Sequence, residues 1–254
     1  MSRYFIEVAY RGTRYSGFQI QENAVTIQSE VEKALQTLHR VPFGLTGSSR
    51  TDAGVHALQN YFHFDFEGVI HPQALYKLNA ILPADIVVKA IQNMPDDAHA
   101  RFDAVRRNYV YKIHRFKNPF LENASFYYPY NLDLTLLKEG AAYLELQNNF
   151  FAFSKTNTQV KNFNCTIYKS VWEEEGDFLF FYLDGNRFLR GMVRLVTATL
   201  LKLARGKITF QQFEKLFEPN GKTVYSVPAH GLYLHSVVYP ENYFSAQPLR
   251  FTMF

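Results

Sequence analysis

Segments with the spacing of strands and segments with the spacing of helices alternate in both halves of this 254-residue chain. Alternating apolar and polar side chains predict strands at 4–10, 58–66, 86–91, 108–116, 166–174, 177–184 and 231–239. Apolar side chains three and four residues apart predict helices at 26–40, 72–82, 134–147 and 186–204. Because both kinds of segment occur in each half, the pattern predicts two similar α/β lobes.

The boundary between these lobes is expected near residues 118–130, which contain two prolines and show no clear period. We therefore predict an N-terminal lobe at 1–117, a linker at 118–131 and a C-terminal lobe at 132–254. Local signals also mark helix ends. Thr26 can cap the first helix, and Thr209 with Gln212 has the form of a capping box.

The composition is that of a folded globular protein, with 20% charged and 47% hydrophobic residues. The single Cys165 cannot form an internal disulfide, and no Cys/His cluster has zinc spacing. The N-terminus has no long apolar stretch, and no run approaches the length of a membrane span. We therefore expect a reducing, cytoplasmic location with no membrane contact.

Basic residues are concentrated in two blocks, although the net charge is only +4. Residues 99–117 carry six Lys or Arg against the single acid Asp103, and residues 185–213 carry six and no acid. These blocks favour a phosphate-bearing partner, although two solvated cationic faces would give the same pattern. The chain also has 17 Tyr and 24 Phe. Most of these rings are expected in the core, and a few beside the basic blocks could stack on bases.

The predicted helix at 186–204 would place Arg187, Arg190 and Arg194 near one face. Arg187 and Arg190 would then lie in the first turn, where the helix dipole favours acidic residues. An anion docking there would explain the placement, and Arg194 could reach an internal carboxylate. The alternative is an ordinary solvated cationic stripe.

The segment 49–57 combines Arg50, Asp52 and Gly54 within five residues. In an extended segment the side chains of Arg50 and Asp52 point the same way, so the cation would keep the carboxylate ionised and oriented. An isolated Asp-x-Gly is usually only a turn, because Asp bonds its own backbone and Gly tolerates positive φ. The nearby arginine is what favours a functional role.

Seven segments, in order, carry a resemblance to a known family. They are Tyr10-Arg11-Gly12-Thr13-Arg14-Tyr15-Ser16-Gly17-Phe18-Gln19-Ile20-Gln21, Thr26-Ile27-Gln28, the segment from Arg50 to Ala57 (RTDAGVHA), Leu78-Asn79 with Leu82-Pro83, His99-Ala100-Arg101-Phe102 followed by Arg107, Tyr109 and Tyr111, Phe188 to Arg194 (FLRGMVR), and Pro228 to Tyr233 (PAHGLY). The chain resembles the tRNA pseudouridine synthases of the TruA type nearly from end to end. Three positions depart from the family pattern: Phe18 for Trp, Ser49 for Gly and Ala198 for Gly.

The resemblance implies an α+β pseudouridine synthase fold with antiparallel sheets flanked by helices and an active-site cleft between the lobes. It implies an isomerase that converts uridine to pseudouridine in the anticodon stem-loop of tRNA, in the region of positions 38–40. It also implies a homodimer, and a reaction that needs neither a metal nor another cofactor. The target uridine would be taken out of its stack before reaction.

The resemblance also implies roles for individual residues. Asp52 would be the nucleophile, attacking either the ribose or the base. Arg194 would hold Asp52 ionised, and Tyr109 would stack on the uracil and help remove the C5 proton. Leu232 would close the base pocket. The remaining substrate-binding residues would be Arg50, Arg107 and Arg190, with Arg50 on a backbone phosphate.

Each role has an alternative. Tyr109 and Leu232 could be ordinary core residues, Arg194 a surface cation, and Arg50 a structural partner of Asp52. His56 is expected to support the loop rather than act as a base. The whole chain could also be a non-catalytic tRNA-binding module on the same fold, or an aspartate hydrolase that uses Asp52 with His56. A silent binder has no use for a carboxylate facing an anionic ligand, and the hydrolase lacks a second placed carboxylate.

Overall fold

The computed structural model describes residues 1–155, 161–244 and 249–250. By packing, the chain forms two compact units, unit 1 with Met1–Val105 and Leu234–Phe254, and unit 2 with Arg106–Tyr233. Strand β9, Leu232–Val238, begins in unit 2 and continues into unit 1. These two units are defined by the contacts within each unit. The division into domains at 1–117 and 132–254 remains a prediction.

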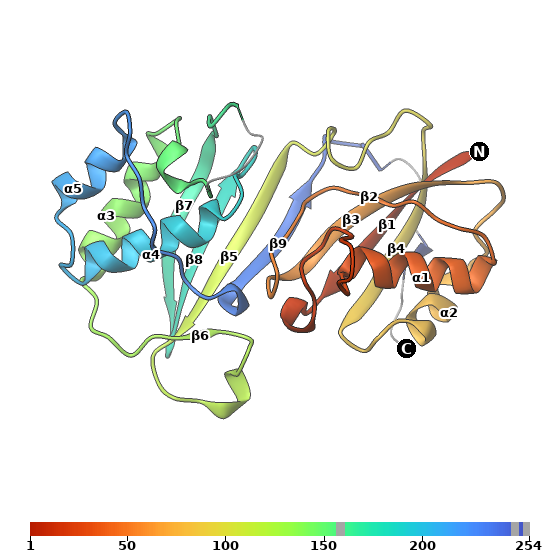
Figure 1. Ribbon diagram of the computed structural model, residues 1–254, viewed down its shortest axis with the longest axis horizontal. Coiled ribbons are helices and arrows are strands. Elements are labelled where there is room, and N and C mark those ends of the chain that lie inside the picture. The colour runs from red at the N-terminus through yellow and green to blue at the C-terminus, as the bar shows by residue number, and fades with distance from the viewer. Residues whose placement is uncertain (156–160, 245–248, 251–254) are drawn as a thin grey trace. The chain divides into compact units, whose positions relative to one another are not determined.

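Unit 1 is built on an antiparallel sheet with β1 at its centre (Figure 1). Strand β1 pairs with β3 on one side and β4 on the other, β4 pairs with β10, and β3 pairs with the short β2. The elements of this unit are β1 Ser2–Tyr10, the 3₁₀ turn η1 Gly12–Arg14, α1 Ile27–His39, β2 Thr46–Gly47, β3 His56–Phe66, α2 Ala74–Ile81, β4 Ile86–Met94 and β10 Leu249–Arg250.

Aromatic residues fill both faces of this sheet. On the face toward α1, Tyr4 stacks on Phe64, and Phe43, which follows the helix, contacts Phe64 edge-on. On the other face, Phe5 packs against Tyr239 and Phe244 from the end of the chain. This alternation follows the pleat of β1, in which neighbouring side chains point to opposite faces. The sheet is therefore fixed from both sides, and the loops at its end are anchored to a rigid base.

The predicted first helix is confirmed as α1. The Thr26 side chain accepts a hydrogen bond from the Ser29 backbone N–H, and the Ser29 side chain accepts one from the Thr26 N–H, so the two close a capping box. Ile27, Val31, Ala34 and Leu35 are buried on one face of this helix. The predicted helix at 72–82 is confirmed as α2, which begins at Ala74 and ends before Pro83.

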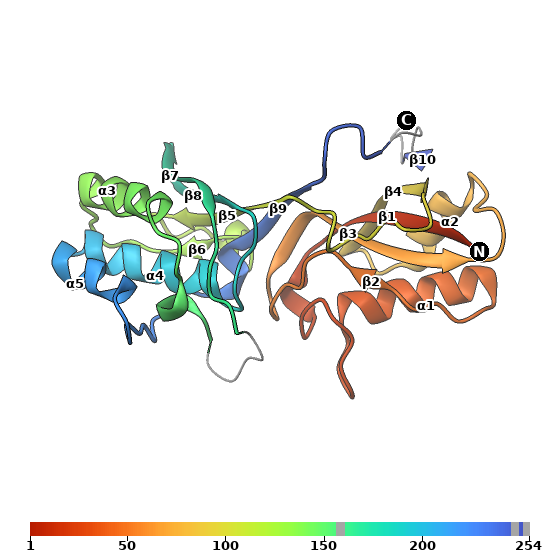
Figure 2. The same ribbon diagram turned by 90° about the horizontal axis from the view of Figure 1, so that it is seen from above.

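In unit 2, β8 lies between β5 and β7 and pairs antiparallel with both. The short β6 pairs in parallel with the end of β5. Figures 1 and 2 show α3, α4 and α5 gathered beside β7 and β8. The elements are β5 Arg106–His114, η2 Pro119–Leu121, β6 Phe126–Tyr127, α3 Leu134–Glu145, η3 Phe151–Phe153, β7 Ile167–Glu175, β8 Phe178–Gly185, α4 Met192–Ala204, α5 Phe210–Glu214, η4 Lys215–Phe217 and η5 Ala229–Gly231.

Helices α3 and α4 pack closely at Gly140. A Cβ at this position would lie 2.8 Å from side-chain carbons of Leu200 and Leu203, so only a glycine fits here without movement. Trp172 of β7 stacks on Phe181 of β8 at 4.7 Å, and both rings are buried. The predicted capping box at Thr209 and Gln212 is confirmed at the start of α5.

The predicted helix at 186–204 is wrong in its first six residues. Helix α4 begins at Met192, and Gly191 precedes it with a left-handed backbone (φ +75°) that a continuing helix cannot adopt. The loop is held instead by other segments: Asn186 N–H donates to the Thr166 carbonyl, and the Arg190 carbonyl accepts from Lys155 N–H. Arg187 and Arg190 therefore lie in a loop, and the predicted arginine stripe along one helix face does not exist.

The expected α+β class is confirmed: the strand pairs described above are antiparallel except for β5 with β6, and helices flank the strands. Among the described residues, no helix is both long and apolar enough to cross a membrane.

Candidate active site

Asp52 lies on a tight turn just before β3. The Val55 N–H donates to the Asp52 carbonyl at 3.1 Å, and Gly54 supplies the positive φ (+78°) that the turn requires. The side chains on either side of this turn are buried, whereas Asp52 itself is half-buried. The turn that Asp-x-Gly predicts is therefore present, and it presents a carboxylate at the end of a rigid strand.

A second segment, residues 11–19, packs directly on this turn. A Cβ added to Gly12 would lie 1.9 Å from the Val55 carbonyl oxygen, and one added to Gly17 would lie 3.0 Å from the Thr51 carbonyl oxygen. The Phe18 N–H donates to the same Thr51 carbonyl at 3.1 Å. Two glycine-containing segments far apart in the sequence therefore touch backbone to backbone around the aspartate.

Buried polar side chains hold residues 48–51, which lead into the turn. Tyr10 Oη and Thr51 Oγ1 share a hydrogen bond of 2.9 Å. The fully buried Asn60 donates from Nδ2 to the Ser49 carbonyl at 2.8 Å and accepts at Oδ1 from the Ser48 hydroxyl at 2.8 Å. Because an unmade hydrogen bond at a buried group is costly, this network fixes the backbone of residues 48–51. It also accommodates Ser49, the residue that departs from the family pattern.

His56 supports the loop, as expected. Its side chain is 1% exposed, and its Nδ1 accepts the Gly12 N–H at 3.0 Å. The other end of the segment is tied to Asp85, whose carboxylate accepts from Arg14 Nε at 2.7 Å and from the Tyr15 hydroxyl at 2.5 Å. Partial burial alone would raise the pKa of Asp85, but these hydrogen bonds outweigh it and hold the pKa below its usual value.

Phe18, the second departure from the family pattern, packs where the glycine of β2 leaves room. Its ring stacks on Phe62 at 4.4 Å, and a Cβ at Gly47 would lie 2.1 Å from the ring. The ring is 1% exposed, and its packing fixes the segment.

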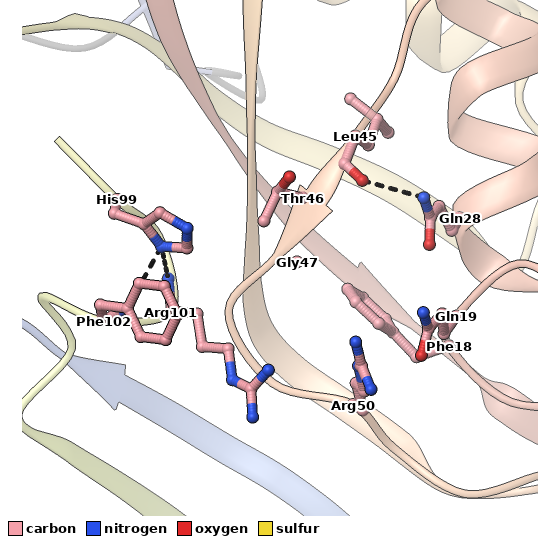
Figure 3. Close-up of a pocket in the computed structure, with 10 residues that line it drawn as sticks. All are labelled: Phe18, Gln19, Gln28, Leu45, Thr46, Gly47, Arg50, His99, Arg101 and Phe102. Carbon is pink, nitrogen blue, oxygen red and sulfur yellow. Dashed lines mark hydrogen bonds between the residues drawn. The ribbon is translucent and has the colours of Figure 1, made fainter. Parts of the chain in front are cut away.

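A pocket of about 220 Å³ opens in unit 1 next to this segment (Figure 3). One wall carries Phe18, Gln19 and Gln28, and the opposite wall carries His99 and Phe102. Arg50 and Arg101 both line it, and the remaining lining residues are Leu45, Thr46 and Gly47. Arg50 was predicted to be a site residue, whereas the pocket itself was not predicted from the sequence.

In unit 2, the predicted residues Arg107 and Tyr109 meet the loop that precedes α4. Tyr109 is buried, and its ring contacts Phe188 edge-on at 5.1 Å. Arg107 donates to the Asn186 carbonyl at 3.1 Å. Arg190, in the same loop, is exposed. The structure thus brings Arg107 and Tyr109 of β5 together with the loop at 186–191, which the sequence analysis placed in a helix.

Arg194 lies in the first turn of α4 and is half-buried. Its Nε donates to the Val227 carbonyl at 2.8 Å, which orients the guanidinium from the segment before η5. His230 follows in η5, and burial, with His114 and Arg194 nearby, lowers the pKa of its imidazole. Leu232, the first residue of β9, is buried. Pairing of Arg194 with Asp52 stays a prediction.

Several cations of the two basic blocks contact side chains of the protein itself. Arg101 lies in unit 1 and the rest of its block in unit 2. Arg106 is 3.6 Å from Asp184 and stacks on Tyr168, and the Lys112 ammonium lies 4.2 Å from the centre of the Tyr233 ring. In the second block, the Arg205 guanidinium lies 3.9 Å from the centre of the Tyr130 ring. Several of these cations therefore have structural partners within their own unit.

Comparison with known proteins identifies the family of this chain. A family model described as tRNA pseudouridine synthase matches residues 6–103 and 141–240. The chain is 41% identical over 251 residues to a tRNA pseudouridine synthase A of Parabacteroides distasonis, covering 97% of this chain and 100% of the relative. It is 40% identical over 252 residues to that of Porphyromonas gingivalis, covering 96% and 100%. It is also 40% identical over 245 residues to that of Bacillus licheniformis, covering 91% and 97%. The chain belongs to the tRNA pseudouridine synthase family.

The roles of the residues that support the site were not predicted from the sequence. Asn60, Ser48 and Tyr10 form the network below the turn, and His99, Phe102 and Gln28 line the pocket. Asn60 had a visible signal, since it and its neighbour Gln59 are amides within a strand that is otherwise rich in aromatic residues. Within the described part of the chain, no group of three or more His, Cys, Asp or Glu could hold a metal ion.

Proposed function

We propose that this protein converts uridine to pseudouridine in tRNA, with Asp52 as the nucleophile and targets in the anticodon stem-loop near positions 38–40. The isomerase activity on tRNA follows from the family. The choice of Asp52 is supported by one observation above all: two segments that match the family separately, 10–21 and 50–57, pack backbone to backbone around this carboxylate.

The reaction rearranges bonds without net loss or gain of atoms. The C1′–N1 bond breaks, the uracil turns within the site, and C5 bonds to C1′. The proton on C5 leaves, and N1 ends with a proton, so no electrons enter or leave. The protein must therefore supply a nucleophile, a surface that retains the loose uracil, and a group that moves one proton.

Asp52 suits the first task. A carboxylate can form a covalent intermediate with the ribose or with the base, and it must be ionised and fixed in position to do so. The turn, the Gly12 and Gly17 contacts and the hydrogen-bonded Thr51 restrict its backbone from three sides. In our proposal Arg194 supplies the cation that keeps the carboxylate charged, with its Nε already oriented by Val227.

Tyr109 and Leu232 suit the second and third tasks. Tyr109 is held edge-on by Phe188, so the ring is preoriented to stack on a base. In our proposal its hydroxyl also helps to remove the C5 proton, and Leu232 closes the base pocket. Arg50, Arg107 and Arg190 bind the RNA backbone.

A homodimer would extend the RNA-binding surface. Support comes from an apolar row along β8, where Phe178, Phe180 and Tyr182 are half-exposed and their rings contact in sequence. We propose that a second copy packs on this row. Sedimentation of wild type and Phe180→Glu tests it: a dimer that becomes monomeric in the variant supports the surface, whereas an unchanged dimer or a monomeric wild type contradicts it.

The target positions are tested by mapping pseudouridine in tRNA. Unmodified tRNA is incubated with the protein, and each new pseudouridine is located by carbodiimide labelling and primer extension. The proposal predicts stops only at uridines in the region of positions 38–40. Modification confined to another arm of the tRNA would contradict the proposed specificity, and tRNA without new pseudouridine would contradict the activity.

A further inference from the structure

The pocket in unit 1 has the charge of an anion site. Two of its ten lining residues are arginines, Arg50 and Arg101, and none is an aspartate or a glutamate. Figure 3 shows Arg101 extending from the wall of His99 and Phe102, and Arg50 near Gln19 on the opposite wall, with both guanidinium groups in the lower part of the view. Two guanidinium groups that line one space favour an anion there, because each attracts it. Arginine binds phosphate oxygens with two parallel N–H donors, so a phosphate fits this pair.

The second wall of the pocket is held in place before any ligand arrives. His99 Nδ1 accepts the backbone N–H groups of Arg101 and Phe102, at 3.1 and 3.3 Å. Asp103 accepts the His99 N–H at 2.7 Å and the Tyr243 hydroxyl at 2.6 Å. The loop that carries Arg101 is therefore held by hydrogen bonds within itself and by one to Tyr243.

The first wall is also fixed. Gln28 of α1 donates from Nε2 to the Leu45 carbonyl at 2.9 Å and accepts the Ile20 N–H at 3.1 Å. Because both walls are already ordered, binding of a ligand would cost little conformational entropy of the protein.

An exposed aromatic ring stands at the pocket. The Phe102 side chain is 75% exposed, although its ring contacts His99 at 4.2 Å and the Arg101 guanidinium lies 5.8 Å from its centre. Exposed aromatic rings beside arginine are the usual stacking platforms for unpaired bases. The volume of about 220 Å³ suits one phosphate or one base rather than a folded element.

The pocket adjoins the aspartate turn. Arg50 is two residues before Asp52, and Phe18, on the first wall, is hydrogen-bonded to Thr51. A nucleotide bound here would be close in the RNA strand to the one that reacts at Asp52. Single-stranded RNA next to an extruded base is unstacked and needs new partners for its own base and phosphate.

We propose that this pocket binds a nucleotide of the tRNA next to the target uridine, with its phosphate between Arg50 and Arg101 and its base against Phe102. The inference rests on the proposed function. It adds to it a second nucleotide site, which grips the strand while the target base is out of its stack.

The phosphate contact is tested with stem-loop RNAs that carry one neutral methylphosphonate at each position around the target. Binding is measured in the Asp52→Asn background, so that no RNA is converted. With an intact pocket, one methylphosphonate next to the target should weaken binding about tenfold, the change that about 1.4 kcal/mol produces. In Arg101→Gln the same substitution should weaken binding by no more than about threefold, because one of the two arginine partners of the phosphate is already gone. Arg40→Gln, an exposed arginine at the end of α1, is the matched control and should keep the full tenfold loss.

The base contact is tested in the same way. An abasic site at that nucleotide should weaken binding to the Asp52→Asn protein about tenfold. It should weaken binding to the double variant Asp52→Asn, Phe102→Leu less than twofold. If the loss of binding caused by the RNA modification is the same in Arg101→Gln or Phe102→Leu as in the protein with an intact pocket, the nucleotide site is refuted. Tritium release from C5-labelled uridine by the otherwise wild-type proteins separates the two claims: no release by wild type refutes the proposed function, whereas normal release with additive losses refutes only this pocket.

Discussion

Replacing Gly12 by alanine tests how strongly the two segments around Asp52 depend on each other. The added Cβ would lie 1.9 Å from the Val55 carbonyl oxygen and 2.7 Å from its carbon. Both atoms are backbone, so no side-chain rotation relieves the overlap. Since ordinary contacts begin near 3.4 Å, the segments must separate by about 1.5 Å. This movement also breaks the hydrogen bond from the Gly12 N–H to His56.

The expected loss follows from these distances. Overpacking in a tight contact costs about 1–3 kcal/mol, and a lost buried hydrogen bond about 1 kcal/mol more. Stability should therefore fall by about 2–4 kcal/mol. A displacement of about 1 Å at a catalytic group costs about a hundredfold in rate. We expect kcat for Gly12→Ala to fall at least about a hundredfold in protein that is still folded.

The assay is tritium release from C5-labelled tRNA under saturating substrate, with thermal unfolding of the same samples. Gly44→Ala is the matched control, because a Cβ at that glycine meets nothing within 4 Å, and both its rate and its midpoint should stay at wild-type values. A Gly12→Ala protein with wild-type kcat would refute the reasoning, because it would show that the turn tolerates the displacement without effect on the reacting carboxylate.

Three further changes have defined outcomes. Asp85→Asn weakens the hydrogen bonds that hold Arg14 and Tyr15, and should lower kcat about tenfold in the tritium assay. Because these partners hold the pKa of Asp85 below its usual value, the ionised carboxylate stabilises the fold above about pH 4, and this stabilisation is lost as the pH falls below that value. Burial above all, with Arg3 and His99, lowers the pKa of His63 to about 4 against about 6.5 when unfolded, so stability should fall by up to about 2 kcal/mol between pH 7 and pH 5 in urea titrations. His63→Gln should flatten that dependence, and an equally steep fall would contradict the assignment. Thr26→Ala removes the cap of α1 and should cost about 0.5–2 kcal/mol in the same titrations, whereas an unchanged midpoint would show that the cap contributes nothing.

Features set by neighbouring residues could be predicted from the sequence. The caps at Thr26 and Thr209 depend on residues three positions away, and the strands depend on alternation within a few residues. The turn at Asp52 was predictable for the same reason, since Gly54 supplies the required backbone angle locally.

The start of α4 could not be predicted in this way. Apolar residues keep helical spacing back to Phe188, but the backbone groups of Asn186 and Arg190 bond to Thr166 and Lys155, which are distant in the chain. Those long-range bonds outweigh the local pattern and leave Gly191 with a left-handed backbone.

The pocket was hidden from the sequence for a similar reason. Gln28, Arg50 and Phe102 come from three separate segments, and only the fold brings them to one space. The family resemblance indicated which segments matter, and the packing shows how Gly12, Gly17 and His56 serve the aspartate.

The central claim is that Asp52 carries out the isomerisation, and tritium release from C5-labelled uridine in unmodified tRNA tests it most directly. Wild type is compared with Asp52→Asn, and Asp97→Asn, which changes an exposed aspartate of the same unit, is the control. We predict release by wild type and by Asp97→Asn, and none by Asp52→Asn even though that variant still binds tRNA. Release by Asp52→Asn at the wild-type rate would contradict the account.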